Sequence, residues 1–194
     1  MSAELIGHLV DRAAAVIAEH AEELTALDQA IGDGDHGVNM KRGFEAIAAQ
    51  RDELTALQLW PAVQKAGMTL VMKVGGASGP LYGSLLMDMG KSSGSPVERL
   101  RAGIEAVRAR GKSDVGAKTM LDVLVPVLEV LEGGGGPAEA RAKAEEAAAA
   151  TRDMKATKGR ASFLGERSVG HVDPGARSSQ LLIGMVCDLL EEGA

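Results

Sequence analysis

Apolar residues recur at three- and four-residue spacing along most of this chain, which is typical of helices that bury one face. No run of alternating β-branched residues, the pattern of a half-buried strand, accompanies them. Hydrophobic residues make up 45% of the chain and aromatic residues only 2%, so alanine, leucine, methionine and valine have to fill the core. Because this composition favours helices packed on helices, we predict an all-α fold of about eight helices.

The helical segments are separated by glycine- and proline-rich stretches, which favour helix ends and helix starts. Their expected ranges are 3–27, 38–51, 59–73, 80–89, 96–110, 118–132, 137–156 and 176–192. The GGGGP turn at 133–137 is the only linker-like stretch, and four glycines make a poor domain boundary. We therefore predict a single domain over residues 1–194.

The charge balance and the termini narrow the class of protein. A net charge of −6 offers no basic surface for nucleic acid. The single cysteine, Cys187, lies in an apolar stretch and rules out a disulfide within the chain, which fits a reducing compartment. The N-terminus lacks the pattern of a signal peptide, and no apolar run approaches the roughly 18 residues of a membrane span. We expect a cytoplasmic protein with no membrane partner.

The loop LDQAIGDGDHGVNM, residues 27–40, holds Asp28, Asp33 and Asp35 among several glycines. Its GDGDHG letters match a dinucleotide-binding fingerprint, but a helix precedes them where a strand is needed. An EF-hand starting at Asp33 would need an acid at its twelfth position, where Phe44 stands.

The alternative interpretation of this loop is a site for a hard cation. Three carboxylates this close repel one another by about 1 kcal/mol per pair even in water, and a divalent cation turns that repulsion into binding. No lysine or arginine stands nearer in the sequence than Lys41. A solvated loop in which aspartate caps a helix is the other interpretation, and we favour magnesium, which accepts phosphate oxygens as further ligands.

Two more irregular segments have residues suited to phosphate. GGASGP, residues 75–80, opens a helix whose N–H groups and dipole attract anions, although by itself it equally suits an ordinary turn. The non-periodic stretch 157–176 contains Arg160, whose planar guanidinium can pair with phosphate, and its length is typical of a lid or binding loop. We find no Walker motif, and we assign no role to His8, His20 or His171.

Four motifs in this order, LDxxIGDGDHGxNM, GGASGPLYG, KTMLD and GRASFLGERSVGHVDPGA, resemble the nucleotide-binding L subunit, or L domain, of dihydroxyacetone kinases. The resemblance covers about residues 24–190. It implies an all-α barrel of eight antiparallel helices with the nucleotide held in loops at one end. One departure is Ala117, where the family commonly has an acid.

The resemblance also implies what each site residue binds. Asp28, Asp33 and Asp35 would bind two Mg²⁺ ions that bridge the diphosphate of ADP. The residues expected to contact the nucleotide are His36, Gly37, Val38, Asn39, Gly76, Ala77, Ser78, Gly79, Gly116, Thr119, Met120, Arg160, Asp173, Pro174 and Gly175. No catalytic residue is expected on this chain, because the acceptor hydroxyl would lie on a partner.

The family works in two modes, either as a domain fused behind the substrate domain that uses ATP or as a separate subunit with tightly held ADP. Because the chain ends at Ala194 with nothing before its first helix, we expect the separate subunit. A phosphohistidine M-type protein of the phosphoenolpyruvate phosphotransferase system would then phosphorylate the ADP. The resulting ATP would phosphorylate dihydroxyacetone on a K subunit.

Two other functions stay open from the sequence. An ATP-dependent subunit could serve another small ketose, such as erythrulose, because the partner chooses the substrate. An ADP–Mg²⁺ module could instead act as a non-enzymatic regulator. The sequence also leaves the oligomeric state open, a homodimer included.

Overall fold

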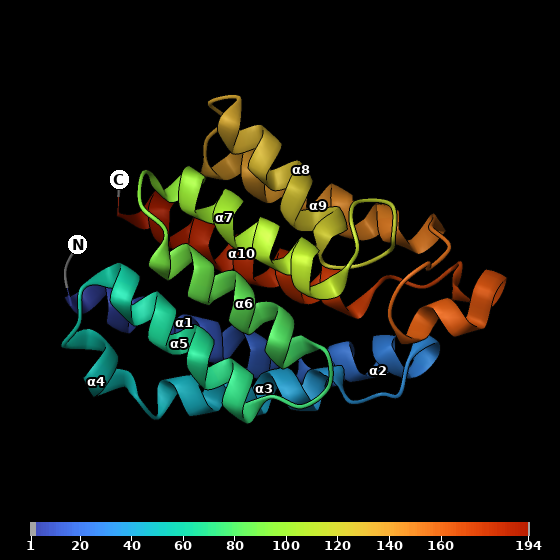
Figure 1. The fold of residues 1–194 in the computed structure, drawn as a ribbon, viewed down its shortest axis with the longest axis horizontal. Helices are drawn as coiled ribbons and strands as arrows, with labels where there is room; N and C mark the ends of the chain where they lie inside the picture. The colour runs from blue at the N-terminus through green and yellow to red at the C-terminus, as the bar shows by residue number, and fades with distance from the viewer. Residues whose placement is uncertain (1–2, 194) are drawn as a thin grey trace. The chain divides into compact units, whose positions relative to one another are not determined.

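The computed structural model describes residues 3–193, which form ten α-helices and two 3₁₀-helices with no strand among them (Figure 1). The prediction of an all-α fold is confirmed. The α-helices are α1 (Ala3–Glu19), α2 (Ala21–Ile31), α3 (His36–Ala48), α4 (Arg51–Thr55), α5 (Leu59–Lys73), α6 (Ser78–Lys91), α7 (Pro96–Gly111), α8 (Leu121–Glu132), α9 (Pro137–Ala150) and α10 (Pro174–Glu192). The 3₁₀-helices are η1 (Thr151–Asp153) and η2 (Arg160–Ser168). Among these residues no helix combines the length and apolar character needed to span a bilayer.

Two additions account for the larger number of α-helices. The expected helix over 3–27 is wrong as a single element, because the backbone at His20 leaves helical values with φ −97° and ψ 8°. The apolar spacing continues through this break, so periodicity cannot detect it. The short helix α4 lies in a stretch expected to be loop. The non-periodic stretch 157–176 contains η2, whose three-residue repeat does not produce an α-helical pattern.

The chain divides into two compact units, each built from two separate stretches of sequence. The first contains α1 and Asn39–Lys112, and the second contains His20–Val38 and the described residues from Ser113 onward. The single domain expected from the sequence stays a prediction.

In the first unit, α5 and α6 lie close together because glycines face each other between them. A Cβ atom placed on Gly67 would lie 2.8 Å from the carbonyl oxygen of Gly83, and one placed on Gly83 would lie 2.9 Å from that of Gly67. Added methyl groups do not fit at these distances, so the two helices meet backbone to backbone. On α7, Arg99 lies over the ring of Trp60, 4.4 Å from its centroid, which adds a cation–π contact.

In the second unit, α8, α9 and α10 share an apolar core made mostly of small residues. Val123 and Val127 of α8 pack with Ala140 and Ala144 of α9 and with Cys187 of α10. Because alanine is small, the alanines on the inner face of α9 let the backbone of this helix approach α8 and α10 closely. Alanine also has the highest helix propensity of any residue. Cys187 is a buried thiol in this core, as its apolar surroundings in the sequence indicated.

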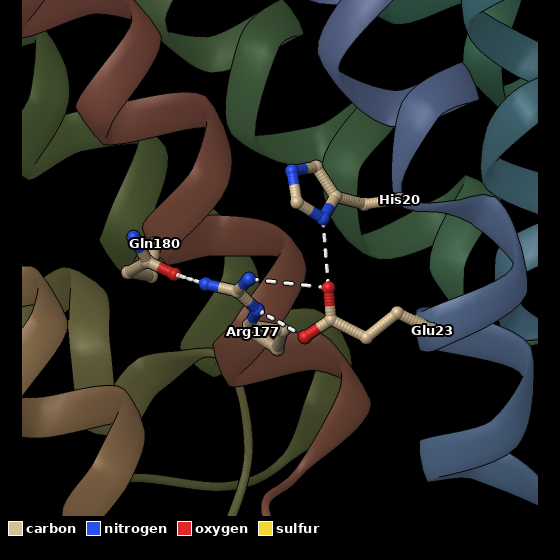
Figure 2. Close-up of polar contacts among 4 residues, drawn as sticks. All are labelled: His20, Glu23, Arg177 and Gln180. Atoms are coloured by element: carbon tan, nitrogen blue, oxygen red, sulfur yellow. Dashed lines mark hydrogen bonds and ion pairs between the residues drawn. The ribbon is translucent and has the colours of Figure 1, made fainter.

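A charged cluster joins α2 to α10 in the same unit (Figure 2). Arg177 of α10 donates from Nε and Nη2 to the two carboxylate oxygens of Glu23, at 2.7 and 3.1 Å. His20 lies 2.7 Å from the same carboxylate through Nδ1, and Gln180 accepts from Arg177. The hydrogen bond from Arg177 holds the pKa of Glu23 below its usual value. This ion pair joins α10 to α2, the helix that carries Asp28 near its end.

We expect Gly83→Ala to destabilise the protein by about 1–3 kcal/mol, because the new methyl group would overlap the side chain of Val71 and crowd the backbone of Gly67. The matched control is Gly184→Ala in α10, where nothing lies within 4 Å of the added Cβ. That change should be neutral or stabilise by up to about 1 kcal/mol through helix propensity. Urea unfolding of both variants measures the difference, and equal stability would contradict close backbone packing at Gly83.

Candidate functional site

The three aspartates singled out in the sequence lie together in the second unit. One carboxylate oxygen from each of Asp28, Asp33 and Asp35 lies within 4.8 Å of the others. Asp28 is buried at the end of α2, whereas Asp33 and Asp35 are exposed on the loop that follows. Oxygen ligands this close, two of them open to solvent, suit a divalent cation that also binds phosphate and water. Metal binding itself stays a prediction.

The Asp28 carboxylate also shapes this loop. Its Oδ2 atom accepts the backbone N–H groups of Asp35, at 2.8 Å, and His36, at 3.1 Å. These N–H groups lie at the start of α3, where a helix has no internal partners for its first donors. Asp28 therefore holds the start of α3 against the end of α2, and the same carboxylate is part of the acidic cluster.

The next two residues, His36 and Gly37, are also held within the protein. His36 is buried with Nε2 2.9 Å from the hydroxyl of Ser178 on α10, and burial lowers its pKa to about 4, so the imidazole is neutral at pH 7. A Cβ on Gly37 would lie 1.9 Å from the carbonyl oxygen of Ala21, so only glycine lets α3 start against α2. Val38, by contrast, is 59% exposed and can contact a ligand.

An arginine reaches the acidic cluster from far along the chain. Arg160 Nη2, at the start of η2, lies 2.9 Å from Asp33 Oδ2. The expectation that Lys41 is the nearest cation holds only along the sequence, because the fold brings Arg160 to the cluster. Its side chain is 70% exposed, so much of the guanidinium is accessible to another anion.

The turn Gly116–Met120 is organised by an aspartate that sequence analysis did not single out. Asp122, in the first turn of α8, is buried and accepts the N–H of Gly116 at 2.5 Å and the N–H of Thr119 at 2.7 Å, one on each carboxylate oxygen. An acid just inside a helix start is the local signal that could have identified it.

The turn Asp173–Gly175 lies beside the turn Gly116–Met120. Asp173 caps α10 by accepting the N–H of Ala176 at 2.7 Å, and its own N–H donates to the hydroxyl of Thr151 at 3.0 Å. A Cβ on Gly175 would lie 3.5 Å from the backbone nitrogen of Met120. Two motifs separated in sequence therefore meet in the second unit. Burial raises the pKa of Asp173 to about 7, and the charge of Asp122 adds to the effect.

The remaining predicted residues belong to the first unit. Asn39 is buried there, accepts a hydrogen bond from Arg42, and has its Oδ1 3.3 Å from where a Cβ on Gly75 would stand. The loop 75–77 is exposed and leads into α6, which begins at Ser78 instead of the expected Pro80. Ser78 and Gly79 are thus in the first helical turn, where backbone N–H groups favour an anion.

Comparison with known proteins assigns this fold and these motifs to a family. The DAK2 domain model matches residues 30–188, so the chain belongs to the DAK2 domain family. The ADP-binding subunit DhaL of PEP-dependent dihydroxyacetone kinase 1 from Listeria innocua is 47% identical over 173 residues, which cover 86% of each chain. The corresponding DhaL subunit from Escherichia coli is 38% identical, and the match covers 96% of each chain.

The fold also matches that of a solved kinase structure. The dihydroxyacetone kinase of C. freundii in complex with AMP-PNP and Mg²⁺ superposes with a TM-score of 0.80 at 25% identity. The match covers 95% of this chain but only 34% of that kinase, so the chain spans about a third of the solved protein.

The raised pKa of Asp173 predicts how stability changes with pH. An unfolded aspartate titrates near 3.8, so between about pH 4 and 7 the folded protein keeps a proton that the unfolded chain has lost. The contribution of Asp173 is therefore full below pH 3.8 and is lost as the pH rises through about 7.

Asp173→Asn keeps a capping oxygen but cannot ionise. From pH 5 to 8, its free energy of unfolding should rise relative to that of the natural protein by roughly 2–3 kcal/mol. Urea unfolding without nucleotide or magnesium at several pH values measures this gap. Parallel stability curves would show that Asp173 ionises normally in the fold.

Proposed function

We propose that this chain is the ADP-binding subunit of a dihydroxyacetone kinase. In this function it relays phosphate from a phosphohistidine protein of the phosphoenolpyruvate phosphotransferase system, through bound ADP, to dihydroxyacetone on a partner K subunit. The observation that carries the proposal is the cluster of Asp28, Asp33 and Asp35 with Arg160 beside it. The two relatives above support it, because they match over most of their own length and are both ADP-binding subunits.

The acidic cluster supplies the ligands for magnesium. Asp33 and Asp35 are exposed, so their oxygens can coordinate ions that also accept diphosphate oxygens, and we propose two Mg²⁺ ions here. Asp28 already accepts two backbone N–H groups, so its part is to hold the loop in shape as well as to add negative charge. When bound, the metal neutralises the charge of the diphosphate and of the transferred phosphoryl group.

The nucleotide would be held by several short segments. In the second unit we assign contacts to Val38, to the turn Gly116–Met120 and to the turn Asp173–Gly175. The contacts expected from the sequence for Asn39 and for the start of α6, which belong to the first unit, stay predictions. The positions of His36 and Gly37 support a role for these two residues in shaping the loop through contacts with α10 and α2.

Arg160 has two partners in this proposal. It pairs with Asp33, and its exposed guanidinium can donate to a phosphate oxygen from the remaining N–H groups. Phosphoryl transfer depends mainly on positioning and on charge neutralisation, which arginine and metal provide. No base is assigned to this chain, because the acceptor hydroxyl would belong to the partner.

Location and assembly are part of the same proposal. The buried single cysteine supports a cytoplasmic protein, since no disulfide is available to stabilise it in an oxidising compartment. The homodimer considered from the sequence stays a prediction.

We expect Asp33→Ala and Asp35→Ala each to weaken the magnesium-dependent binding of ADP by about 100-fold or more, because each variant lacks a metal ligand. Mutation of residues that only support a metal's ligands already lowers metal affinity by about 10–100-fold. The fold should remain, since both side chains are exposed. Asp11→Ala is the matched control, as it removes an exposed carboxylate that pairs with Arg51. Nucleotide content after gel filtration in excess magnesium measures retention, and full retention in both variants would refute the metal site.

The bound nucleotide should act as a cofactor that stays on the protein through many turnovers. The protein is loaded with radiolabelled ADP and given excess unlabelled ADP, phosphoenolpyruvate, the general phosphotransferase proteins, and the M and K partners. Label should remain bound while dihydroxyacetone phosphate accumulates, because enclosure by several segments slows release.

The other outcomes separate the alternatives. Loss of label at the rate of product formation would indicate an exchanging, ATP-dependent kinase, and the K partner would then be tested with erythrulose. Stable binding of label with no product from either phosphoenolpyruvate or ATP would indicate a regulatory module.

A further inference from the structure

The segment that carries Arg160 is a loop whose two ends lie close together. It runs from Met154, just after η1, to Ser168 at the end of η2, and we call it the Arg160 loop. In Figure 1 it is the orange segment at the right of the view, which follows α9 along the chain and lies beside α2. Compact loops of this size with adjoining ends are commonly functional.

A buried lysine joins the two ends of this loop. Lys118 is 1% exposed, and its Nζ donates to the carbonyl oxygen of Met154 at 3.1 Å and to that of Ser168 at 2.5 Å. Burial lowers the pKa of Lys118, and the nearby carboxyl groups of Asp173 and Asp153 partly oppose this effect. A buried ammonium is costly unless it is hydrogen-bonded and near opposite charge, so this arrangement has a specific structural role.

The backbone at Lys118 supports the same conclusion. Its φ is +61°, in the left-handed region that disfavours residues with a side chain. This backbone conformation is strained for lysine, and at Lys118 it is accompanied by the two side-chain hydrogen bonds to the neck of the loop.

Further hydrogen bonds close the neck around the lysine. The Ser168 hydroxyl accepts the N–H of Ala156 at 2.9 Å and donates to the carbonyl of Gly165 at 2.7 Å. The N–H of Thr157 donates to the carbonyl of Ala117, at 3.2 Å, so the residue next to Lys118 also contacts the loop.

The loop packs on the end of α2, beside the acidic cluster. Ala156, Ala161 and Leu164 pack with Ile31, the last residue of α2. Arg160 then pairs with Asp33, two positions beyond Ile31. The neck and this apolar contact together set where the guanidinium stands.

We propose that Lys118 is a positioning residue that clasps the neck of the Arg160 loop and so holds Arg160 at the acidic cluster. The inference rests on the proposed function for its link to ADP, but the clasp itself is independent of any ligand. Lys118 lies within the turn Gly116–Met120, whose backbone Asp122 holds. One turn therefore supports both a proposed nucleotide contact and the loop that carries the arginine.

The test replaces Lys118 by methionine, which keeps the length and the backbone strain but removes the ammonium. The control is Lys155→Met in the same loop, where the lysine makes an exposed ion pair with Glu166. Hydrogen exchange of the Ala156 and Thr157 amides in nucleotide-free protein reports on the neck. In Lys118→Met these amides should exchange at least about tenfold faster, while α9 amides keep their rates and Lys155→Met matches the natural protein.

A second measurement asks whether the lysine acts through Arg160. Release of labelled Mg²⁺–ADP should be about tenfold faster in Lys118→Met and in Arg160→Ala, and the double variant should release no faster than Arg160→Ala. A defect unrelated to Arg160 would instead multiply the two effects in the double variant.

The outcomes separate this inference from the proposed function. Unchanged exchange at Ala156 and Thr157 would overturn the clasp, and faster exchange with unchanged ADP release, or with multiplying effects, would overturn its action through Arg160. If the natural protein does not bind Mg²⁺–ADP, the proposed function fails while the exchange result still decides the clasp. Should Lys118→Met fail to fold, Lys118→Gln replaces it, because the shorter side-chain amide cannot bridge both carbonyl groups at the neck. Faster exchange at Ala156 and Thr157 is then expected, and unchanged rates would contradict the clasp.

Discussion

The carboxylate of Asp28 stands where α2 ends and α3 begins, and it accepts two N–H groups from the start of α3. The same group is one of three carboxylates within 4.8 Å of one another. The hydrogen bonds stabilise its negative charge, so the like charges of Asp33 and Asp35 are held close to it despite repulsion of about 1 kcal/mol per pair in water. The helix start and the acidic cluster proposed to bind magnesium therefore share the Asp28 carboxylate.

Buried polar side chains provide hydrogen-bond partners for the backbone of the irregular segments. A helix pairs its own backbone groups, but a loop leaves N–H and C=O groups that need partners. In the second unit Asp122 accepts from one turn, Lys118 donates to the ends of another loop, and Asp173 caps α10. These buried polar groups give the long non-periodic segments the hydrogen-bond partners that a defined conformation needs. Burial also raises the pKa of Asp173 to about 7, because an ionised carboxylate is disfavoured away from water.

Glycine has a different use in the first unit. At Gly67 and Gly83 its value is the absence of a side chain, which lets α5 and α6 meet along their backbones. With aromatic residues at only 2%, close approach and small residues replace large side chains as the means of filling space. The helix α6 that is held in this way begins at the exposed loop proposed to contact phosphate.

By itself the sequence determined what depends on short-range spacing. Periodic apolar residues indicated the helices, and three aspartates within eight positions had to lie close together wherever the loop went. Even locally, spacing missed the break at His20, because the apolar register continues across it. The resemblance of four motifs added the expected nucleotide contacts and the two proposed metal ions, which spacing could not supply.

Only the tertiary structure brought Arg160 to Asp33, His36 to Ser178, and the ammonium of Lys118 to the neck of the Arg160 loop. No local pattern encodes these pairs, because each depends on how distant segments pack. An isolated lysine or arginine in a sequence is usually a solvated surface charge. Burial and a partner give it another role, and both are properties of the folded chain.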